Sequence, residues 1–366
     1  MRKCKKSIKA CLIGLILVSF IGPTTVNSQK THEVIVSNLS IPWGFTFLPD
    51  NAMLITEKKG ELIHFKNGKK TTIKGLPSIK VIGQGGLMDI ELHPNYKSNG
   101  WIYFTYVSGN SGGGNTTLMR ARINNFKLIN QEVLYKASPD TRRGQHFGSR
   151  IAFDRKGFVY FSVGDRGNRD MNPQDLTKDG GKIYRLHDNG SIPKDNPFVT
   201  RKGAKKAIYS YGHRNPQGME INPFTGEIWT HEHGPRGGDE INIIKEGINY
   251  GWPKASYGIN YSGTKFTDKT SIKGMKDPLH QWTPSIAPSG MAFVNSRKYP
   301  AMHGNLLVGS LKFRYISLCT IKNGKVINEE KLLKDIGRVR SIEQGNDGYI
   351  YAGIERLGII KILPKK

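Results

Sequence analysis

A unit of two strand-like segments recurs six times along this chain, and this repetition limits the possible folds more than any other feature. Each unit begins with a short alternating apolar segment, passes through a turn rich in Pro, Asp, Asn or Gly, and ends in an aromatic-rich segment. Alternation with a period of two is the pattern of β-strands. The units begin near Trp43, Leu87, Arg150, Gly218, Gly290 and Val339.

The spacing of the units predicts how the strands are arranged. Six sheet units at spacings of roughly 40–70 residues are typical of a β-propeller, in which radial repetition leaves only short, protected sheet edges. Most units are followed by a further strand-like run, such as 182–186 or 358–363. We therefore predict an all-β, six-bladed β-propeller, and we expect the early segment 32–36 to complete the last blade. A large β-sandwich is the competing fold, but it explains the repetition poorly.

The first residues of the chain have the features of a secretory signal peptide. Five Lys or Arg residues precede an apolar segment from Ala10 to about Gly22, and Val26-Asn27-Ser28 resembles a cleavage site. We predict a signal peptide at 1–28, a single domain at 29–366, and export to the periplasm or the extracellular space. An uncleaved membrane anchor is the alternative, but the apolar segment is short for a membrane-spanning helix.

Cysteine usage and net charge narrow the class of protein. Cleavage would remove Cys4 and Cys11 and leave Cys319 alone, so the mature chain could form no internal disulfide. An exported chain without disulfides needs a large core or a bound metal. The formal net charge of +26 favours anionic ligands. The lysines are nevertheless dispersed and no RNA-binding motif accompanies them, so we expect a solvated basic surface and no nucleic-acid partner.

Two glycine-rich polar segments, 212–218 and 232–242, stand at the ends of predicted strands. Their glycines let backbone groups approach a ligand closely, and they also carry arginine, asparagine and carboxylate side chains. Arginine recognises planar carboxylates, and oxygen ligands suit a hard cation such as calcium. These segments therefore predict a site for an anion and a metal. In a propeller, loops from several blades meet around the central channel, so distant residues can join this site.

Candidate residues for the site come from different units. A histidine such as His146 can act as a general base near neutral pH, and the Arg338-x-Arg340 spacing puts two guanidinium groups on one face of a strand. The seven candidate residues include no acidic side chain, so together they predict a small, planar, polyanionic ligand. The plainer alternatives are a hydrogen-bonded loop histidine, and salt bridges from Arg214 to nearby carboxylates. The candidates are Gln84, His146, Arg214, Asn215, Lys312, Arg338 and Arg340.

Three motifs resemble those of a known family, the soluble aldose sugar dehydrogenases that depend on pyrroloquinoline quinone (PQQ) and are related to soluble quinoprotein glucose dehydrogenase. The motifs are Tyr-Gly-His-Arg-Asn-Pro-Gln-Gly at 211–218, Gly-Pro followed by Asp-Glu-Ile-Asn within 234–242, and Asn-Tyr-Gly-Trp-Pro at 249–253. The resemblance implies a six-bladed propeller that oxidises aldoses at the anomeric carbon to lactones. It also implies PQQ and Ca²⁺ as cofactors, an external electron acceptor, and a monomer or homodimer. The short apolar segment near the N-terminus separately predicts no stable membrane insertion.

The resemblance assigns roles to individual residues. It implies that His146 takes the proton of the anomeric hydroxyl, while hydride passes to the quinone, and that Arg214 polarises the quinone oxygens. Position 145 is glutamine where some family members carry an acidic residue, which leaves the tuning of His146 open. The implied cofactor contacts are Gln84, Arg214, Asn215, Tyr261, Lys312, Arg314, Arg338 and Arg340. The implied calcium ligands are the carbonyls of Gly234 and Pro235 beside the cofactor, and Glu240 with the carbonyl of Tyr250 at a structural ion.

Two other functions are compatible with a propeller. One is a non-catalytic module that binds glycans or a protein partner. Such a module is expected to have lost His146 or the cofactor-binding cations, and this chain keeps all of them. The other is a calcium-dependent hydrolase such as a lactonase, which predicts acidic and Asn metal ligands in the channel without the Arg-x-Arg pair.

Overall fold

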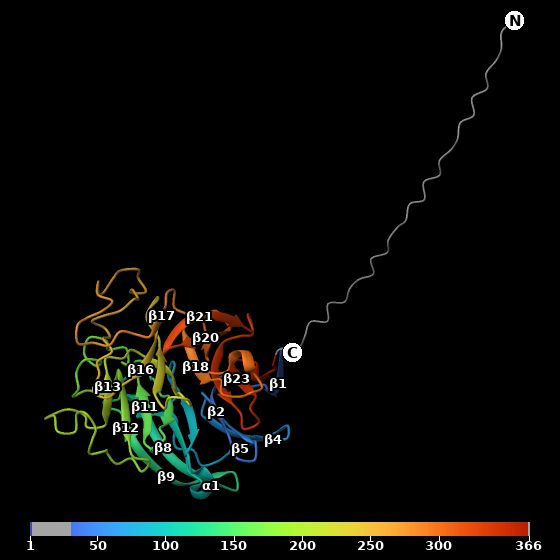
Figure 1. Ribbon diagram of the computed structural model, residues 1–366. Helices are drawn as coiled ribbons and strands as arrows, with labels where there is room; N and C mark the ends of the chain where they lie inside the picture. The colour runs from blue at the N-terminus through green and yellow to red at the C-terminus, as the bar shows by residue number, and fades with distance from the viewer. Residues whose placement is uncertain (2–30, 365–366) are drawn as a thin grey trace. The chain divides into compact units, whose positions relative to one another are not determined.

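Six four-stranded antiparallel sheets follow one another along the chain in the computed structural model, which describes Met1 and residues 31–364. Figure 1 shows the sheets in chain order, with the first strand, β1, beside the strands of the last blade. The predicted six-bladed β-propeller is confirmed, and the β-sandwich alternative is not what the chain adopts. The predicted signal peptide lies, apart from Met1, outside the described residues.

The first three blades run from Pro42 to Tyr211. Blade 1 consists of β2 (Pro42–Phe47), β3 (Met53–Glu57), β4 (Glu61–Lys66) and β5 (Lys69–Ile73). Blade 2 consists of β6 (Leu87–Leu92), β7 (Ile102–Asn110), β8 (Gly113–Asn124) and β9 (Lys127–Lys136), with the short α1 (Tyr96–Asn99) between β6 and β7. Blade 3 consists of β10 (Ile151–Phe153), β11 (Val159–Val163), β12 (Lys182–Leu186) and β13 (Ile208–Tyr211).

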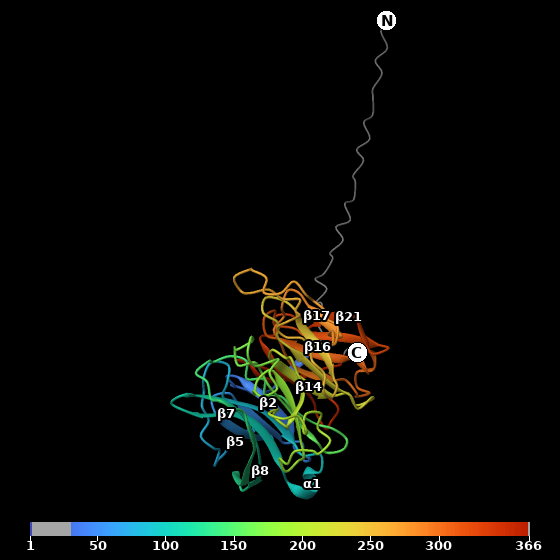
Figure 2. The same cartoon turned by 90° about the vertical axis from the view of Figure 1, so that its left-hand side faces the viewer.

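The last three blades repeat this order, and Figure 2 shows them from the side. Blade 4 consists of β14 (Pro216–Ile221), β15 (Ile228–Glu232), β16 (Asp239–Ile244) and β17 (His280–Trp282). Blade 5 consists of β18 (Pro288–Phe293), β19 (Leu306–Ser310), β20 (Ile316–Lys322) and β21 (Lys325–Leu332), with the 3₁₀ turn η1 (Pro300–Met302) after β18. Blade 6 consists of β22 (Val339–Gln344), β23 (Ile350–Ile354), β24 (Gly358–Ile362) and β1 (His32–Ser37).

Strand β1 closes the ring by pairing antiparallel with β24, as the segment 32–36 predicted. Blade 6 is thus assembled from both ends of the described chain. The first strand of each blade contacts the first strands of its neighbours, from β2 and β6 round to β22 and β2. These six strands therefore form the innermost ring, and the loops that precede them are the ones that can supply an axial site.

Apolar side chains pack between neighbouring blades. Tyr103 of blade 2 shares a buried cluster with Phe161 of blade 3, and Leu307 of blade 5 shares one with Ile350 of blade 6. The second strands β3, β11, β15, β19 and β23 are buried at every position. A strand that is covered on both faces favours a nearly continuous apolar sequence, which explains the aromatic-rich half of each repeated unit.

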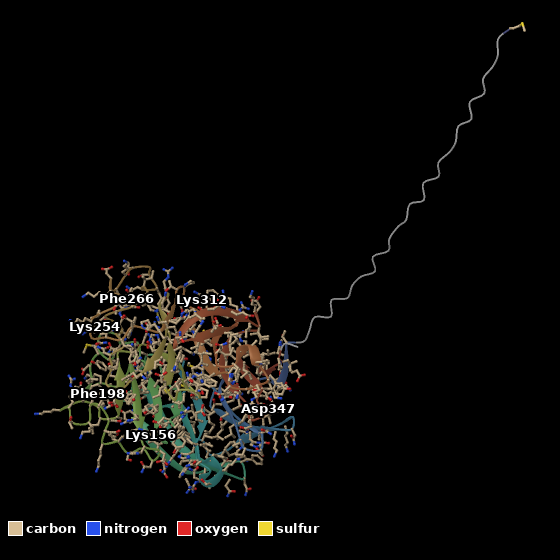
Figure 3. All side chains as sticks on the ribbon, in the orientation of Figure 1. Lys156, Phe198, Lys254, Phe266, Lys312 and Asp347 are labelled. Carbon is tan, nitrogen blue, oxygen red and sulfur yellow. The ribbon has the colours of Figure 1, made fainter. Side chains whose placement is uncertain are left out.

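Several lysines illustrate where basic side chains lie at the surface. Lys156, Lys254 and Lys312 are exposed and lie on different blades or loops (Figure 3). Cys319 is buried and free. Among the described residues no helix has the length and apolar character needed to cross a membrane.

A single arginine, Arg150, ties blade 3 to four other blades at the centre of the ring. Its guanidinium donates to Asp89 of blade 2 (2.8 Å), to the carbonyl of Gln217 of blade 4 (2.8 Å) and to the carbonyl of Arg340 of blade 6 (2.7 Å). It also lies 4.2 Å from the ring centroid of Trp43 in blade 1. Asp89 and Arg150 are both nearly fully buried, so each charge depends on the other for its partner.

Replacing Arg150 with methionine is expected to lower the free energy of unfolding by about 3 kcal/mol, because the Asp89 carboxylate would stay buried without its cation. Urea denaturation measures the change. The matched control is Lys66→Met, which removes an exposed ion pair with Asp50 (2.7 Å) and is expected to cost less than about 1 kcal/mol. Equal stability of the two variants would contradict the central role of Arg150.

Candidate active site

The candidate base His146 lies in the loop before β10 and is held by a buried carboxylate. Its Nδ1 is 2.7 Å from Oδ1 of Asp165, which follows β11, and its backbone N–H donates to Oε1 of Gln84 (2.9 Å). His146 adopts a φ of 55°, a left-handed conformation that is unusual for a residue other than glycine and often marks a functional position. Because Nδ1 is engaged, Nε2 is the ring nitrogen available to a substrate.

The groups around His146 and Asp165 determine the protonation state of each side chain. Burial lowers the pKa of His146, and the positive charges of Arg214 and Arg166 lower it further, against the opposing effect of Asp165. Burial alone would raise the pKa of Asp165, but the hydrogen bond from His146 and nearby positive charge outweigh this effect and hold that pKa below its usual value. At neutral pH the pair is therefore a neutral imidazole beside a carboxylate, which is the state that a general base requires.

Asp165 was missed by the sequence analysis. Its Oδ1 also accepts the N–H of Gly167 (2.7 Å), and its Oδ2 accepts the indole N–H of Trp252 (2.9 Å). It supplies the acidic partner that Gln145 does not. The sequence feature that could have identified Asp165 is its position just after an aromatic-rich strand, in the same blade as His146.

Arg214 is buried, and its guanidinium is only partly satisfied by the protein. Its Nη1 donates to the carbonyls of His233 (3.1 Å) and Gly234 (3.0 Å), whereas its Nε is buried and has no partner among residues 31–364. Glu232 accepts the backbone N–H of Arg214 and not its guanidinium. The alternative of a side-chain salt bridge is therefore wrong for Glu232, and the free Nε fits an acceptor on a ligand.

Two adjoining cavities contain most of the predicted residues. The axial cavity, of about 350 Å³, is lined among others by Trp43, Lys58, Gln84, His233, Arg338, Arg340 and Glu355. The histidine cavity, of about 260 Å³, is lined among others by Arg143, His146, Asp165, Arg169, Arg214, Pro235, Trp252 and Tyr261. Two hydrogen bonds join the walls of the two cavities. In one, the backbone N–H of His146 donates to the side chain of Gln84, and in the other, the guanidinium of Arg214 donates to the carbonyl of His233. Tyr261 is 72% exposed and stands at the rim.

Glu355 changes the charge balance of the axial cavity. Its carboxylate accepts Nε of Arg338 (2.6 Å) and Nε of Arg340 (3.1 Å), so the expectation of cations without a balancing acid is wrong. Burial lowers the pKa of Arg340. Lys58, Arg338 and Arg340 still outnumber the one carboxylate, so the cavity keeps an excess of positive charge.

The remaining predicted residues lie beside these cavities. Lys312 and Arg314 are exposed and line a third cavity of about 540 Å³, which shares Arg338 and Glu355 with the axial cavity. Asn215 is buried beneath the site, where its Oδ1 accepts the N–H of Gly148 (3.1 Å). The structure therefore gathers every candidate cofactor contact around one region of the ring.

The carbonyl groups predicted to bind calcium lie close to Arg214. Gly234 is buried in a tight turn where a Cβ atom would come within 2.0 Å of the carbonyl oxygen of Gly237, so only glycine fits. Pro235 follows it and lines the histidine cavity. Within the described residues no group of three or more His, Cys, Asp or Glu side chains has a metal-binding arrangement. Binding at this turn would therefore depend on backbone oxygens.

The second predicted calcium position is rich in oxygen atoms. Burial raises the pKa of Glu240 well above its usual value, and the neighbouring Glu232 carboxylate, its cross-strand partner, adds to this rise. Oδ1 of Asn242 is buried there without a partner among the described residues. Tyr250 packs its ring on His213 at a centroid distance of 4.7 Å. Clustered carboxylates and an unsatisfied amide oxygen fit a hard cation.

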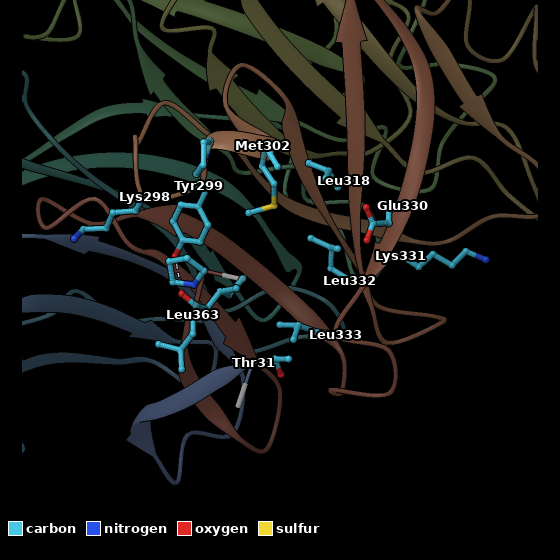
Figure 4. A pocket seen from close by; sticks show the side chains of 14 residues that line it. Thr31, Lys298, Tyr299, Met302, Leu318, Glu330, Lys331, Leu332, Leu333 and Leu363 are labelled. Carbon is cyan, nitrogen blue, oxygen red and sulfur yellow. Dashed lines mark hydrogen bonds between the residues drawn. The ribbon is translucent and has the colours of Figure 1, made fainter. Parts of the chain in front are cut away.

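A more apolar cavity of about 320 Å³ lies elsewhere, between β20, β21 and β24 (Figure 4). Its walls include Tyr299, Leu318, Leu332 and Leu363, and the hydroxyl of Tyr299 donates to the carbonyl of Ile362 (2.6 Å). It contains no histidine and none of the predicted residues. The candidate chemistry therefore belongs to the axial and histidine cavities.

Comparison with known proteins places this site in a family. Residues 39–360 match the family model described as Glucose / Sorbosone dehydrogenase. The chain is 40% identical to the aldose sugar dehydrogenase YliI of Escherichia coli (strain K12), over 97% of this chain and 98% of that protein. The crystal structure of the soluble aldose sugar dehydrogenase from Escherichia coli in the apo-form has a TM-score of 0.88 at 40% identity, and the match covers 91% of this chain and 99% of that one.

A cofactor-bound structure is also similar. The PQQ-bound form of aldose sugar dehydrogenase from Streptomyces coelicolor has a TM-score of 0.76 at 25% identity, and the match covers 91% of this chain and 97% of that one. The family model spans most of the described chain, and the identity to YliI extends over nearly all of it. The chain therefore belongs to the glucose/sorbosone dehydrogenase family, as its motifs predicted.

Proposed function

We propose that this protein oxidises aldose sugars at the anomeric carbon to lactones, with PQQ and Ca²⁺ as cofactors, and passes the electrons to an external acceptor. The proposal rests on the buried His146–Asp165 pair, which stands at the junction of two cavities lined by Arg214, Arg338 and Arg340. The names of the similar proteins, one of them solved with PQQ, support the substrate class and the cofactor.

The lining of the axial cavity fits a planar polyanion such as PQQ. Its cations outnumber Glu355, Gln84 offers a neutral polar group, and Trp43 and Phe147 provide apolar walls. The unpartnered Nε of Arg214 adds a donor from the neighbouring cavity. Lys312 and Arg314 would complete the anion contacts, and Asn215 and Tyr261 would flank the ring. When bound, PQQ supplies an electrophilic quinone that accepts a hydride.

The residues of the histidine cavity would perform the proton chemistry. Nε2 of His146 takes the proton of the anomeric hydroxyl as the C1 hydride leaves the sugar. Asp165 stabilises the imidazolium that forms, since its carboxylate is 2.7 Å from Nδ1. Arg214 holds positive charge where negative charge develops, and its burial strengthens this effect.

Calcium would be held by the carbonyls of Gly234 and Pro235 beside the cofactor, and by Glu240 with the carbonyl of Tyr250 at the second position. Both sets consist of oxygen atoms, as this ion prefers. We further propose that residues 1–28 are a cleaved signal peptide, that 29–366 form one exported catalytic domain, and that it acts as a monomer or homodimer. An N-terminus at Gln29 in the exported protein would support the cleavage site, and any other N-terminus would contradict it.

Removal of calcium is expected to lower the melting temperature of the apoprotein by several degrees, because an ion that binds only the folded state at 100 times its Kd adds about 2.7 kcal/mol. Thermal unfolding with and without a chelator measures the loss. In Glu240→Gln the chelator is expected to have a clearly smaller effect, because the second calcium position is lost, whereas Glu227→Gln, on the same blade, keeps the full response. A full response in Glu240→Gln would contradict the assignment of Glu240.

Reconstitution tests the proposed activity. PQQ and Ca²⁺ are added to the purified apoprotein, and dye reduction is followed with a panel of aldoses, with the absorbance of PQQ recorded in parallel. We expect sugar-dependent dye reduction that needs both cofactors. Absence of activity with every sugar, together with no spectral sign of PQQ binding, would refute the proposal. PQQ binding without turnover would favour the non-catalytic alternative.

A further inference from the structure

We propose that Trp252 is a positioning residue for the catalytic pair, because its indole N–H holds the carboxylate of Asp165 in the orientation that His146 requires. The inference rests on the proposed role of His146 as the base. Trp252 belongs to the Asn-Tyr-Gly-Trp-Pro motif at 249–253, in which the family resemblance assigns a role to Tyr250 but none to Trp252.

The two oxygens of the Asp165 carboxylate have different partners. Oδ1 accepts His146 Nδ1 (2.7 Å) and the N–H of Gly167 (2.7 Å), while Oδ2 accepts the indole N–H of Trp252 (2.9 Å). Asp165 is almost fully buried, so water does not replace a lost donor freely. The carboxylate cannot rotate without breaking one of these bonds, and the indole therefore fixes the plane in which Asp165 meets His146.

The indole is itself fixed by groups from several segments. The backbone N–H of Trp252 donates to the carbonyl of Gly212 (2.9 Å), and its carbonyl accepts the side-chain amide of Gln174 (2.8 Å). The guanidinium carbon of Arg214 lies 5.3 Å from the indole centroid, and Phe266 meets the indole edge-on at 5.2 Å. Trp252 is 7% exposed, so its position is set by packing on both sides.

Phe266 connects the indole to the loop at the rim of the histidine cavity. Arg169 lies 4.6 Å from the ring centroid of Phe266 and donates to the side chain of Asn260 (2.8 Å). Arg169 and Asn260 both line the histidine cavity, as does Trp252. The loop that faces a bound sugar is thus joined to the base through Phe266, Trp252 and Asp165.

Loss of the indole N–H has a defined electrostatic consequence. The charged groups that act most strongly on His146 are Asp165, Arg214 and Arg166, with His233 nearby. The same cavity is also lined by Arg143, Arg169, Asp170 and Tyr261, none of which loses a contact when the indole N–H is removed. A hydrogen bond to a carboxylate withdraws negative charge, so Asp165 becomes more basic when Trp252 stops donating. The more basic carboxylate holds the imidazolium of His146 more firmly, so the pKa of His146 rises and less neutral base is available near pH 7.

Trp252→Phe tests the inference, and this chain provides a matched control. Trp282 is 6% exposed and donates its indole N–H to the Glu329 carboxylate (2.7 Å) at the outer edge of blade 4, so Trp282→Phe deletes the same kind of bond away from the base. The first measurement is the NMR titration of His146 in the apoprotein, which needs no cofactor. We expect a higher pKa of His146 in Trp252→Phe and no change in Trp282→Phe.

The second measurement is the pH profile of kcat in the reconstituted enzyme. Trp252→Phe is expected to lower kcat near pH 7 about tenfold and to move the acid limb of the profile to higher pH, with KM for the sugar within about twofold. If phenylalanine destabilises the fold, benzothienylalanine at position 252 keeps the shape of tryptophan without its N–H. An unchanged His146 titration, or equal changes in the control, overturns the inference. A shifted titration in a protein that oxidises no sugar refutes the proposed function alone.

Discussion

Replacing His146 with alanine is expected to lower kcat for aldose oxidation by roughly 10³-fold, because general-base catalysis contributes 10²–10⁴-fold and no described group replaces Nε2. PQQ affinity is expected to stay within about threefold of the original value, because the cavity lined by Arg338 and Arg340 is left intact. Dye-linked kinetics measure the first quantity, and a titration followed by fluorescence measures the second.

His303→Ala is the control for the loss of a histidine. His303 is exposed beside η1 and lines neither the axial nor the histidine cavity, so this variant is expected to keep full activity. If His146→Ala retained more than about a tenth of the original kcat, the assignment of the base would be wrong.

Replacing Asp165 with asparagine is expected to lower kcat by roughly 10²-fold, because an amide cannot stabilise the imidazolium of His146 and favours the wrong tautomer. The sign of the pH effect follows from the electrostatics. Asp165 raises the pKa of His146, so its neutralisation lets that pKa fall further below the usual value. The acid limb of the kcat profile should therefore move to lower pH while the plateau falls.

Asp154→Asn is the matched control, since Asp154 belongs to the same blade and binds the hydroxyl of Tyr160 (3.2 Å) away from the site. Its pH profile is expected to match that of the original enzyme. An acid limb that stayed in place or moved to higher pH in Asp165→Asn would contradict the pairing. Trp252→Phe and Asp165→Asn are thus expected to move the limb in opposite directions, which a general loss of structure would not produce.

Much of the fold was predictable because each blade is encoded locally. Alternation and turn residues mark the strands, and six recurrences predict the ring. The ring then predicts that His146, Arg214 and Arg340 meet, because loops from successive blades converge on the axis. Closure by the segment 32–36 was predictable for the same reason, since blade 6 otherwise lacks a strand.

The partners of the site residues were not predictable, because they depend on side-chain contacts between segments far apart in sequence. Trp252 reaches Asp165 from another blade, and Glu355 lies in a turn with no motif of its own. Without Glu355 the cations Arg338 and Arg340 appeared unbalanced, and this expectation was wrong. The contacts of Arg150 with four other blades also depend on its position at the centre of the ring. A local sequence pattern does not encode that position.

A single-turnover measurement tests the central proposal most directly. The apoprotein is loaded with PQQ and Ca²⁺, oxygen and dye are excluded, and an aldose is mixed in while the spectrum of the bound quinone is followed. We predict that the oxidised spectrum disappears at a rate that depends on sugar concentration, and that it persists over the same time in His146→Ala. A quinone spectrum that no aldose changes would contradict the proposal that these cavities form a sugar-oxidising site.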